Sequence, residues 1–252
     1  MNADLKQKYG DINVLDLKEK YGDINIPDLQ MENLTNHVNL SMVYSVNGEN
    51  TQNIVRIKGD TMSSMVLFFT PEYAVIGTDS RCVTKDLKLI TDSKRKIFQY
   101  GDALIGVVGR TNFYWHGKKM EVEDILKEPD SFYPFLKEAH LQCGKDDKVN
   151  MFIIEPRYID YEGKNIKTLI FTSVEITIGK IEAVSNESHN RACAGVLNCR
   201  GFKETLPFNP SDKSEMIDNV RKCIEYDAKR NEAVGGDIVI YEICVDGTIN
   251  KV

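Results

Sequence analysis

The stretch SSMVLFFTPEYAVIGTDSR, residues 63–81, decides the fold prediction for this chain. It predicts an apolar strand over Met65–Phe69, a tight turn, and a return strand over Tyr73–Gly77. In such a hairpin, the residue that opens the first strand comes back beside the residue that ends the second. The pattern therefore predicts that the hydroxyl of Ser63 and the carboxylate of Asp79 lie close together.

Three further segments extend this pattern. Lys94-Arg95-Lys96-Ile97 follows the hairpin, Ala103–Gly109 is an apolar strand that ends in glycine, and Gly235–Tyr241 is a Gly-Gly pair followed by a strand. Together with the hairpin, these segments resemble the proteasome β-type subunits, which are N-terminal-nucleophile (Ntn) hydrolases. The resemblance covers roughly residues 61–250 and is weakest between about 145 and 205.

The resemblance implies a fold and a set of site residues. The implied fold is α+β, a four-layer αββα sandwich of two antiparallel sheets. In this family the first residue of the mature chain is the nucleophile, and its own α-amine acts through water as the base. The matching positions are Ser63 as nucleophile, Lys96 as its electrostatic activator, Asp79 as the group that orients Lys96, and Gly109 as the oxyanion N–H donor. Thr61 has the family's residue type but breaks its spacing, so it stays an alternative nucleophile.

Each of these positions also has a purely structural interpretation. Serine is common at the start of a strand, and an aspartate such as Asp79 can serve only the fold. The basic run Lys94–Lys96 can form a solvated turn, and Gly109 can be an ordinary turn glycine.

Three departures from the family pattern bear on activity. Met62 precedes Ser63, where self-processing subunits carry glycine. Asn231 and Val234 stand where the family has a supporting Asp and Ser, and Cys193-Ala194-Gly195 replaces a Gly-Ser-Gly segment. These support groups normally hold the terminal amine and the nucleophile. Two functions therefore stay open: a Ser/Thr-type endopeptidase that releases its nucleophile by self-processing, and a non-catalytic ring or assembly subunit resembling the proteasome α-type subunits.

Composition limits the remaining function classes. The chain has 252 residues, of which 42% are hydrophobic and 28% charged, as in a globular protein. A net charge of −6 without a basic stripe argues against nucleic acid, and the lack of a long apolar run or signal peptide argues against membrane and secretion. The six scattered cysteines indicate reduced thiols of a cytoplasmic protein. The four histidines without paired spacing argue against a metal site, and we expect no cofactor. The expected partners are a polypeptide substrate and further copies of the chain in a homo-oligomeric ring.

We expect the chain to have two parts. Residues 1–60 form an N-terminal extension with a duplicated 12-residue repeat at 5–28, and residues 61–252 form the hydrolase-like domain. Two short copies are too few for a repeat architecture. The repeat is either a surface segment without function, or a docking segment or pro-segment.

Hydrophobic periodicity predicts the remaining elements. Strands are expected over 149–154, 166–174 and 175–184, helices over 111–127, 132–141 and 212–230, and a closing hairpin over 237–252. The first helix carries more large apolar side chains than one buried face needs: Phe113, Tyr114, Trp115 and Met120. This excess predicts an interface, and with the family's rings it predicts a multimer of at least about six subunits.

Overall fold

The computed structural model of the protein describes residues 40–41, 56–57, 63–84, 86–161, 163–186, 192–196 and 213–252. By its contacts the chain divides into two units, Met1–Val38 and Asn39–Val252, and every described residue belongs to the second. The duplicated repeat, Thr61 and Met62 lie outside the described residues. The domain boundary predicted at residue 60 stays a prediction.

The described part is mixed α+β, with antiparallel sheets and few helices. The first large sheet has five strands in the order β14-β3-β4-β15-β16. Their bounds are β3 Met65–Phe69, β4 Tyr73–Asp79, β14 Ala192–Val196, β15 Ile238–Cys244 and β16 Ile249–Lys251. The hairpin predicted from the sequence is confirmed, because β3 and β4 pair antiparallel from Phe69↔Ala74 to Met65↔Thr78.

The Thr70 N–H closes the hairpin turn by donating to the Tyr73 carbonyl at 2.8 Å, and the Thr70 hydroxyl reinforces it. The side-chain oxygen of Thr70 accepts a hydrogen bond from the Tyr73 N–H at 3.0 Å and donates one to the Tyr73 carbonyl at 2.9 Å. Pro71 adds a fixed φ to the same turn. The register of β3 against β4 therefore follows from local turn chemistry.

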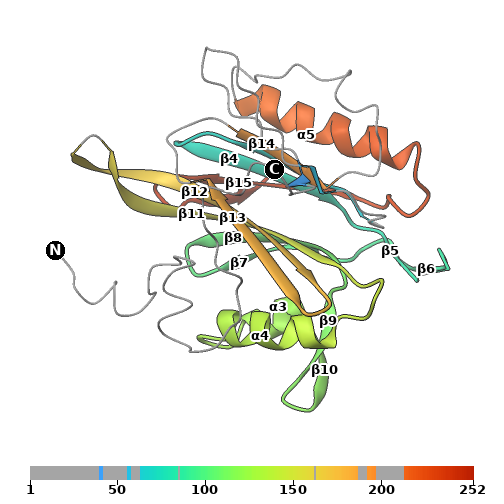
Figure 1. Ribbon diagram of the computed structural model, residues 1–252. Helices are drawn as coiled ribbons and strands as arrows, with labels where there is room; N and C mark the ends of the chain where they lie inside the picture. Colours follow the sequence, from blue (N-terminus) through green and yellow to red (C-terminus); the bar gives the residue numbers. More distant parts are fainter. Residues whose placement is uncertain are drawn as a thin grey trace. The chain divides into compact units, whose positions relative to one another are not determined.

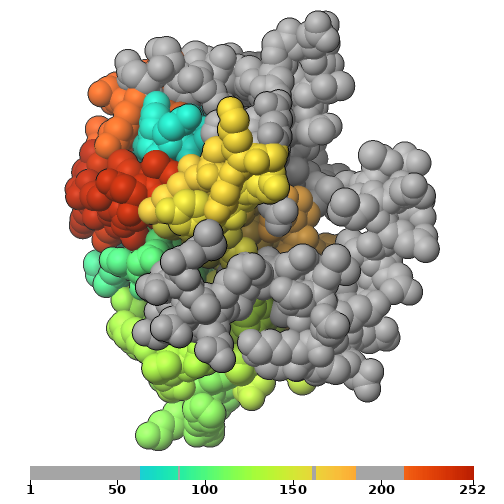
Figure 2. All heavy atoms as spheres, turned by 90° about the vertical axis from the view of Figure 1, so that its left-hand side faces the viewer, coloured from blue at the N-terminus to red at the C-terminus, as the bar shows by residue number. Residues whose placement is uncertain are grey.

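The second large sheet also has five antiparallel strands, in the order β13-β12-β11-β8-β7. Their bounds are β7 Ile97–Tyr100, β8 Ala103–Gly109, β11 Val149–Tyr161, β12 Lys164–Thr177 and β13 Lys180–Asn186. In the face shown in Figure 2, the hairpin of β11 and β12, in yellow, lies beside the C-terminal residues in red and above the green residues of the segment that follows β8.

Three strand pairs and three helices complete the described elements. The pairs are β1 Leu40–Ser41 with β2 Arg56–Ile57, β5 Cys82–Val83 with β6 Leu89–Thr91, and β9 Asn112–Trp115 with β10 Lys118–Glu121. The helices are α3 Val122–Leu126, α4 Phe132–Gln142 and α5 Lys213–Ala228.

Three buried clusters join these elements. One cluster takes residues from both large sheets, among them Met65 and Ile76 from the first and Phe152 and Phe171 from the second. The rings of Phe152 and Phe171 meet edge to face at 5.2 Å, and burying a side chain of this size stabilises the fold by roughly 1.5–3 kcal/mol. A second cluster joins β7, β8, β11 and β12 to α3 and α4, and a third joins β3, β4 and β15 to α5. In Figure 1, α5 accordingly lies on one side of the sheets, and α3 and α4 lie on the other.

The prediction of one helix over 111–127 is wrong. The segment forms the β9–β10 hairpin and only then the short helix α3. Phe113 and Trp115 point into the core, with 1% and 4% exposure, whereas Tyr114 between them is 61% exposed. This alternation has the period of a strand, and the left-handed φ angles of His116 and Gly117 close the turn. The aromatic excess was thus two core residues and one surface residue.

Other boundaries differ by smaller amounts. The predicted strands 166–174 and 175–184 are in fact β12 and β13, with their turn at Ile178-Gly179 rather than after Val174. β11 continues to Tyr161, well beyond the predicted end at 154, because its outer half pairs with β12 alone. The helices predicted over 132–141 and 212–230 are confirmed as α4 and α5, and the closing hairpin as β15–β16.

Candidate active site

The β3–β4 hairpin brings the start of one strand to the end of the other. Ser64, just before β3, donates its backbone N–H to Asp79 Oδ1 at 2.9 Å, and the Asp79 N–H reaches the Ser64 carbonyl at 3.3 Å. The predicted proximity of Ser63 and Asp79 follows from this pairing. Asp79 is fully buried and Ser63 is 7% exposed.

Lys96 enters this corner from the segment just before β7. Its Nζ lies 2.8 Å from Asp79 Oδ1 and 3.0 Å from Ser63 Oγ, and only 4% of the residue is exposed. The backbone of Lys96 is fixed by β8, because the Val107 N–H donates to its carbonyl at 2.8 Å. Burial lowers the pKa of the Lys96 ammonium, and the charge and hydrogen bond of Asp79 oppose that shift.

The basic run around Lys96 divides between two environments. Lys94 and Arg95 pair with the carboxylates of Glu121 and Glu123 at 2.6 and 3.0 Å, on the hairpin and helix that follow β8. Lys96 alone turns inward. The alternative of a solvated Lys-Arg-Lys turn is therefore wrong for Lys96, which is the member of the run that reaches Asp79.

The carboxylate of Asp79 accepts four hydrogen bonds. Oδ1 receives the Ser64 N–H and Lys96 Nζ, and Oδ2 receives the N–H groups of Arg81 and Gly235, each at 3.2 Å. Four donors match the accepting capacity of an ionised carboxylate. They hold the carboxylate in one orientation, with Oδ1 toward Lys96.

The two adjacent serines differ in their surroundings. The hydroxyl of Ser63 is bonded to Lys96, whereas the hydroxyl of Ser64 is buried and has no hydrogen-bond partner among the described residues. The two residues share a side-chain type, and the resemblance singled out Ser63. Only Ser63 stands beside a group that can change the acidity of its hydroxyl.

Gly109 ends β8, two residues beyond the Val107 N–H that is bonded to Lys96. Its φ of +93° and its surroundings require glycine, because a Cβ there would lie 2.0 Å from the Lys148 carbonyl oxygen. The hydrogen bonds of the site join Ser63, Lys96 and Asp79, and Gly109 lies at the end of the strand that supports them.

Gly235 and Arg81 contact Asp79 directly, which the sequence patterns do not predict. The Gly-Gly pair is part of the resemblance, but its Gly235 N–H reaches Asp79 from 156 positions away. Nearby, the Asn231 side chain accepts a hydrogen bond from the Ala233 N–H at 3.0 Å, and Val234 is buried. Asn231 and Val234 thus shape the loop that carries Gly235, at positions where the resembled family has Asp and Ser.

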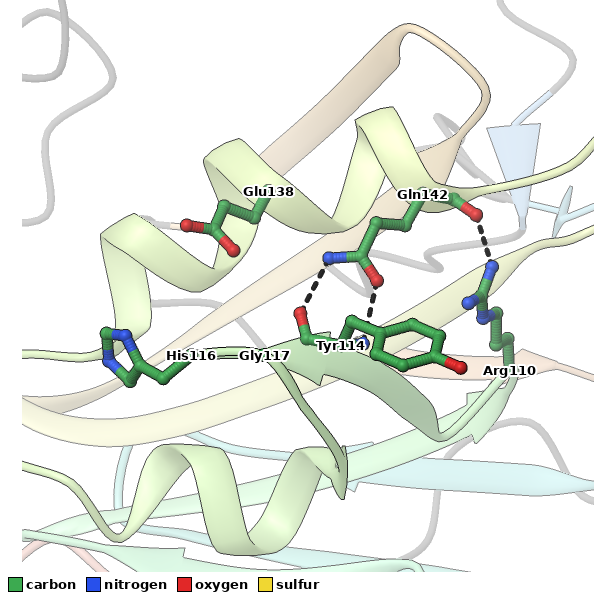
Figure 3. Close-up of a pocket in the computed structure, with 6 residues that line it drawn as sticks. All are labelled: Arg110, Tyr114, His116, Gly117, Glu138 and Gln142. Atoms are coloured by element: carbon green, nitrogen blue, oxygen red, sulfur yellow. Dashed lines mark hydrogen bonds between the residues drawn. The ribbon is translucent and has the colours of Figure 1, made fainter.

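A separate surface hollow of about 700 Å³ lies between the β9–β10 hairpin and α4 (Figure 3). Its polar groups are largely engaged with one another. The side chain of Gln142 bonds both the N–H and the carbonyl of Tyr114 at 2.8 Å, and Arg110 bonds the Gln142 carbonyl and Asp147. These hydrogen bonds connect α4 to β9. The polar residues that make them therefore have a structural role.

The described residues contain no group of three His, Cys, Asp or Glu side chains that could hold a metal ion. Among the same residues, no helix combines the length and apolar character needed to cross a bilayer. Among the described cysteines, Cys82, Cys143 and Cys244 are free thiols.

Comparison with known protein families and with curated proteins finds no match to this chain. The chemistry of the site therefore has to be argued from its geometry. A serine hydroxyl, a lysine ammonium and an aspartate share one buried corner, which is an arrangement that can activate a hydroxyl nucleophile.

Proposed function

We propose that this chain is a proteasome-like Ntn hydrolase subunit, a Ser/Thr-type endopeptidase with Ser63 as its nucleophile. The observation that carries the proposal is the position of Lys96 Nζ, 3.0 Å from Ser63 Oγ and 2.8 Å from Asp79 Oδ1 in a buried corner. Burying a lysine and an aspartate is costly unless they are paired. A pair that also contacts a hydroxyl at a strand start favours a chemical role.

The arrangement of the elements supports the same proposal. Two five-stranded antiparallel sheets share one buried cluster, and each has a separate cluster with helices. We infer that together they form the four-layer αββα sandwich of the Ntn fold, with the site at one end of the β3–β4 hairpin.

The proposed self-processing begins with Ser63 Oγ attacking the carbonyl carbon of Met62. The hydroxyl proton passes to a base and from there to the backbone nitrogen of Ser63, which leaves as an amine, so that an ester joins Met62 to Ser63. Water then hydrolyses the ester, releasing residues 1–62 and a chain that begins with a free Ser63 amine. That amine serves as the base in later turnovers, when Ser63 attacks the amide carbonyl of a polypeptide substrate.

Lys96 acts on the hydroxyl through its charge. Its ammonium stabilises the developing alkoxide of Ser63, and burial lowers the pKa of that ammonium while Asp79 opposes the shift. Asp79 keeps the ammonium in place. Gly109, at the end of β8, is the proposed N–H donor to the oxyanion.

A second candidate is a non-catalytic subunit of the same fold, which builds a ring or an assembly. Asn231 and Val234 favour it, because neither supplies the carboxylate or hydroxyl that supports a terminal amine in the resembled family. Under this candidate, the chain keeps residues 1–62.

Intact mass spectrometry of the freshly purified and incubated protein distinguishes the two candidates. We expect the wild-type chain to lose residues 1–62 and the Ser63→Ala chain to stay at 28.6 kDa. Ser64→Ala is the matched control, since it removes a neighbouring buried hydroxyl but keeps the N–H that donates to Asp79. It should be processed like the wild type.

Three other results would change the assignment. A wild-type chain that stays intact contradicts self-processing and favours the non-catalytic subunit. A new terminus at Thr61 moves the nucleophile to that residue. Loss of processing in Ser64→Ala as well as Ser63→Ala would show that the serines act through folding rather than through the Ser63 hydroxyl.

A further inference from the structure

Arg81 lies two residues beyond Asp79 and connects three separate segments. Its Nε and Nη2 donate to the carboxylate of Asp92 at 2.7 and 3.4 Å, and its Nη1 donates to the carbonyl of Glu232 at 2.8 Å. Asp92 belongs to the segment between β6 and Lys96, and Glu232 to the loop after α5. The Arg81 guanidinium therefore connects the end of β4 with the segment before Lys96 and with the loop after α5.

The loop after α5 is bonded to the same stretch through its backbone. The Gly235 carbonyl accepts the N–H groups of Ser80 at 3.1 Å and Arg81 at 2.8 Å, while the Gly235 N–H donates to Asp79 Oδ2. The Ser80 hydroxyl bonds the Asp92 carbonyl and accepts the Asp237 N–H at 2.7 Å. The placement of Gly235 on Asp79 thus depends on contacts that converge on Arg81 and Asp92.

Gly235 leaves room for the guanidinium itself. A Cβ at this position would lie 2.7 Å from Arg81 Cζ and 2.9 Å from both terminal nitrogens. The guanidinium therefore packs against the glycine backbone, at a distance that any side chain on residue 235 would prevent.

We propose that Arg81 is a positioning residue whose forked contacts with Asp92 and the Glu232 carbonyl hold the Gly235 N–H on Asp79, so that Asp79 stays oriented toward Lys96. This inference rests on the proposed function only for its catalytic meaning. The geometry of Arg81, Gly235, Asp79 and Lys96 can be tested without any hydrolysis.

The side chain of Arg81 has to donate in two directions, because the Asp92 carboxylate and the Glu232 carbonyl lie on different segments. A guanidinium presents several N–H donors in one rigid plane, whereas an ammonium is a single compact centre on a flexible chain. Arg81→Lys keeps the positive charge near Asp79 but cannot reproduce both contacts. Any effect of this variant therefore reports geometry rather than net charge.

The measurement is the titration of Lys96, followed by NMR at its side chain in the full-length protein. The groups that act on its charge are Asp79 on β4, Cys82 on β5 and Lys94 in its own segment. When the carboxylate of Asp79 is less well held, burial still lowers the pKa of Lys96, but the attraction to Asp79 that opposes this shift is weaker. We expect Arg81→Lys to lower the Lys96 midpoint by about one pH unit, the size of shift that a close opposite charge produces.

Gly235→Ala tests the same contact from the other side. The added Cβ displaces the guanidinium while the residue 235 N–H is retained, so it should lower the Lys96 midpoint in the same direction. The double variant should show no larger shift than either single variant, because both break one arrangement. Gly235→Ala also keeps the inference testable if Arg81→Lys fails to fold.

Arg157→Lys is the matched control. Arg157 forms a comparable partly buried ion pair with Glu155 at 2.8 Å, on β11 and away from the site. It should leave the Lys96 midpoint unchanged. An unchanged midpoint in Arg81→Lys and Gly235→Ala, an equal shift in Arg157→Lys, or a double variant whose shift is the sum of the single shifts would each overturn the inference.

Failure of the proposed function is a different result. If the wild type neither processes itself nor cleaves peptides, yet Arg81→Lys shifts the Lys96 midpoint, the positioning role stands and the hydrolase assignment falls. If the wild type is active and the midpoint does not move, the positioning role falls alone.

Discussion

At the scale of single residues, the decisive feature is the pairing of Asp79 with Lys96. Both side chains are almost completely removed from water, at 1% and 3% side-chain exposure. Isolated charges in such a place would carry a penalty of several kcal/mol each. The pair and its hydrogen bonds offset that penalty, and they do so beside the Ser63 hydroxyl.

This pairing makes the two residues energetically dependent on each other. Asp79→Asn should destabilise the protein by roughly 3–5 kcal/mol, because it leaves a buried ammonium without its counter-charge. The amide also has a single oxygen to offer to four donors. Adding Lys96→Met should recover part of the loss, since the unpaired ammonium is then gone. Urea denaturation of the two single variants and the double variant measures the coupling.

A surface pair provides the control. Asp124 and Lys127 lie 2.8 Å apart but have side-chain exposures of 53% and 64%. Asp124→Asn should cost less than about 1 kcal/mol, with little coupling to Lys127. If Asp79 and Lys96 behaved in the same additive way, they would be solvated charges, and the proposed site would lose its two best-defined polar groups.

At the scale of elements, the first residue of α5 forms an ion pair with the first large sheet. Lys213, its first residue, lies 2.5 Å from Glu242 on β15, and Asn250 on β16 donates to the same carboxylate at 2.9 Å. Burial would raise the pKa of Glu242, but the hydrogen bonds from Lys213 and Asn250 and the charge of Lys213 outweigh it and lower the pKa. The helix then runs over Gly77, where a Cβ would meet Val220 at 2.3 Å.

The direction of that shift sets the pH dependence of this attachment. A carboxyl whose pKa is lower in the folded state stabilises the fold above its unfolded pKa, and the contribution is lost as the pH falls through the folded value. Glu242→Gln should therefore cost about 1 kcal/mol near neutral pH and almost nothing well below pH 4. Denaturation curves at both pH values check this. Glu182→Gln, at an exposed pair with Lys180, should show no such difference.

At the scale of the whole molecule, assembly remains the main prediction. The aromatic argument for an interface is weakened, because Phe113 and Trp115 belong to the core. The resemblance to ring-forming subunits is what supports it, and symmetric closure is the usual outcome for such chains. Light scattering should give a mass of at least about six subunits. A clean monomer, whether the intact chain of 28.6 kDa or the shorter chain left after processing, would contradict the ring under both candidate functions.

Local patterns in the sequence predicted the elements whose contacts join residues near each other along the chain. The β3–β4 hairpin, the closing hairpin and the helix α5 were all predicted, because turn residues and periodicity act between neighbours along the chain. The proximity of Ser63 and Asp79 across the hairpin was predicted in the same way, because the hairpin is a local element. The helix predicted over 111–127 failed because a cluster of apolar residues has two periodic interpretations, and only burial against α4 selects the strand.

The tertiary structure alone decided which polar groups meet. Nothing local separates Lys96 from Lys94 and Arg95, or Ser63 from Ser64. The separation arises because the segment before β7 is bonded to β8, while Glu121 and Glu123 bind the other two basic residues. The Gly235 N–H reaches Asp79 only when β15 pairs with β4, far from it in sequence. Such contacts depend on how sheets and helices pack, and no local periodicity encodes that packing.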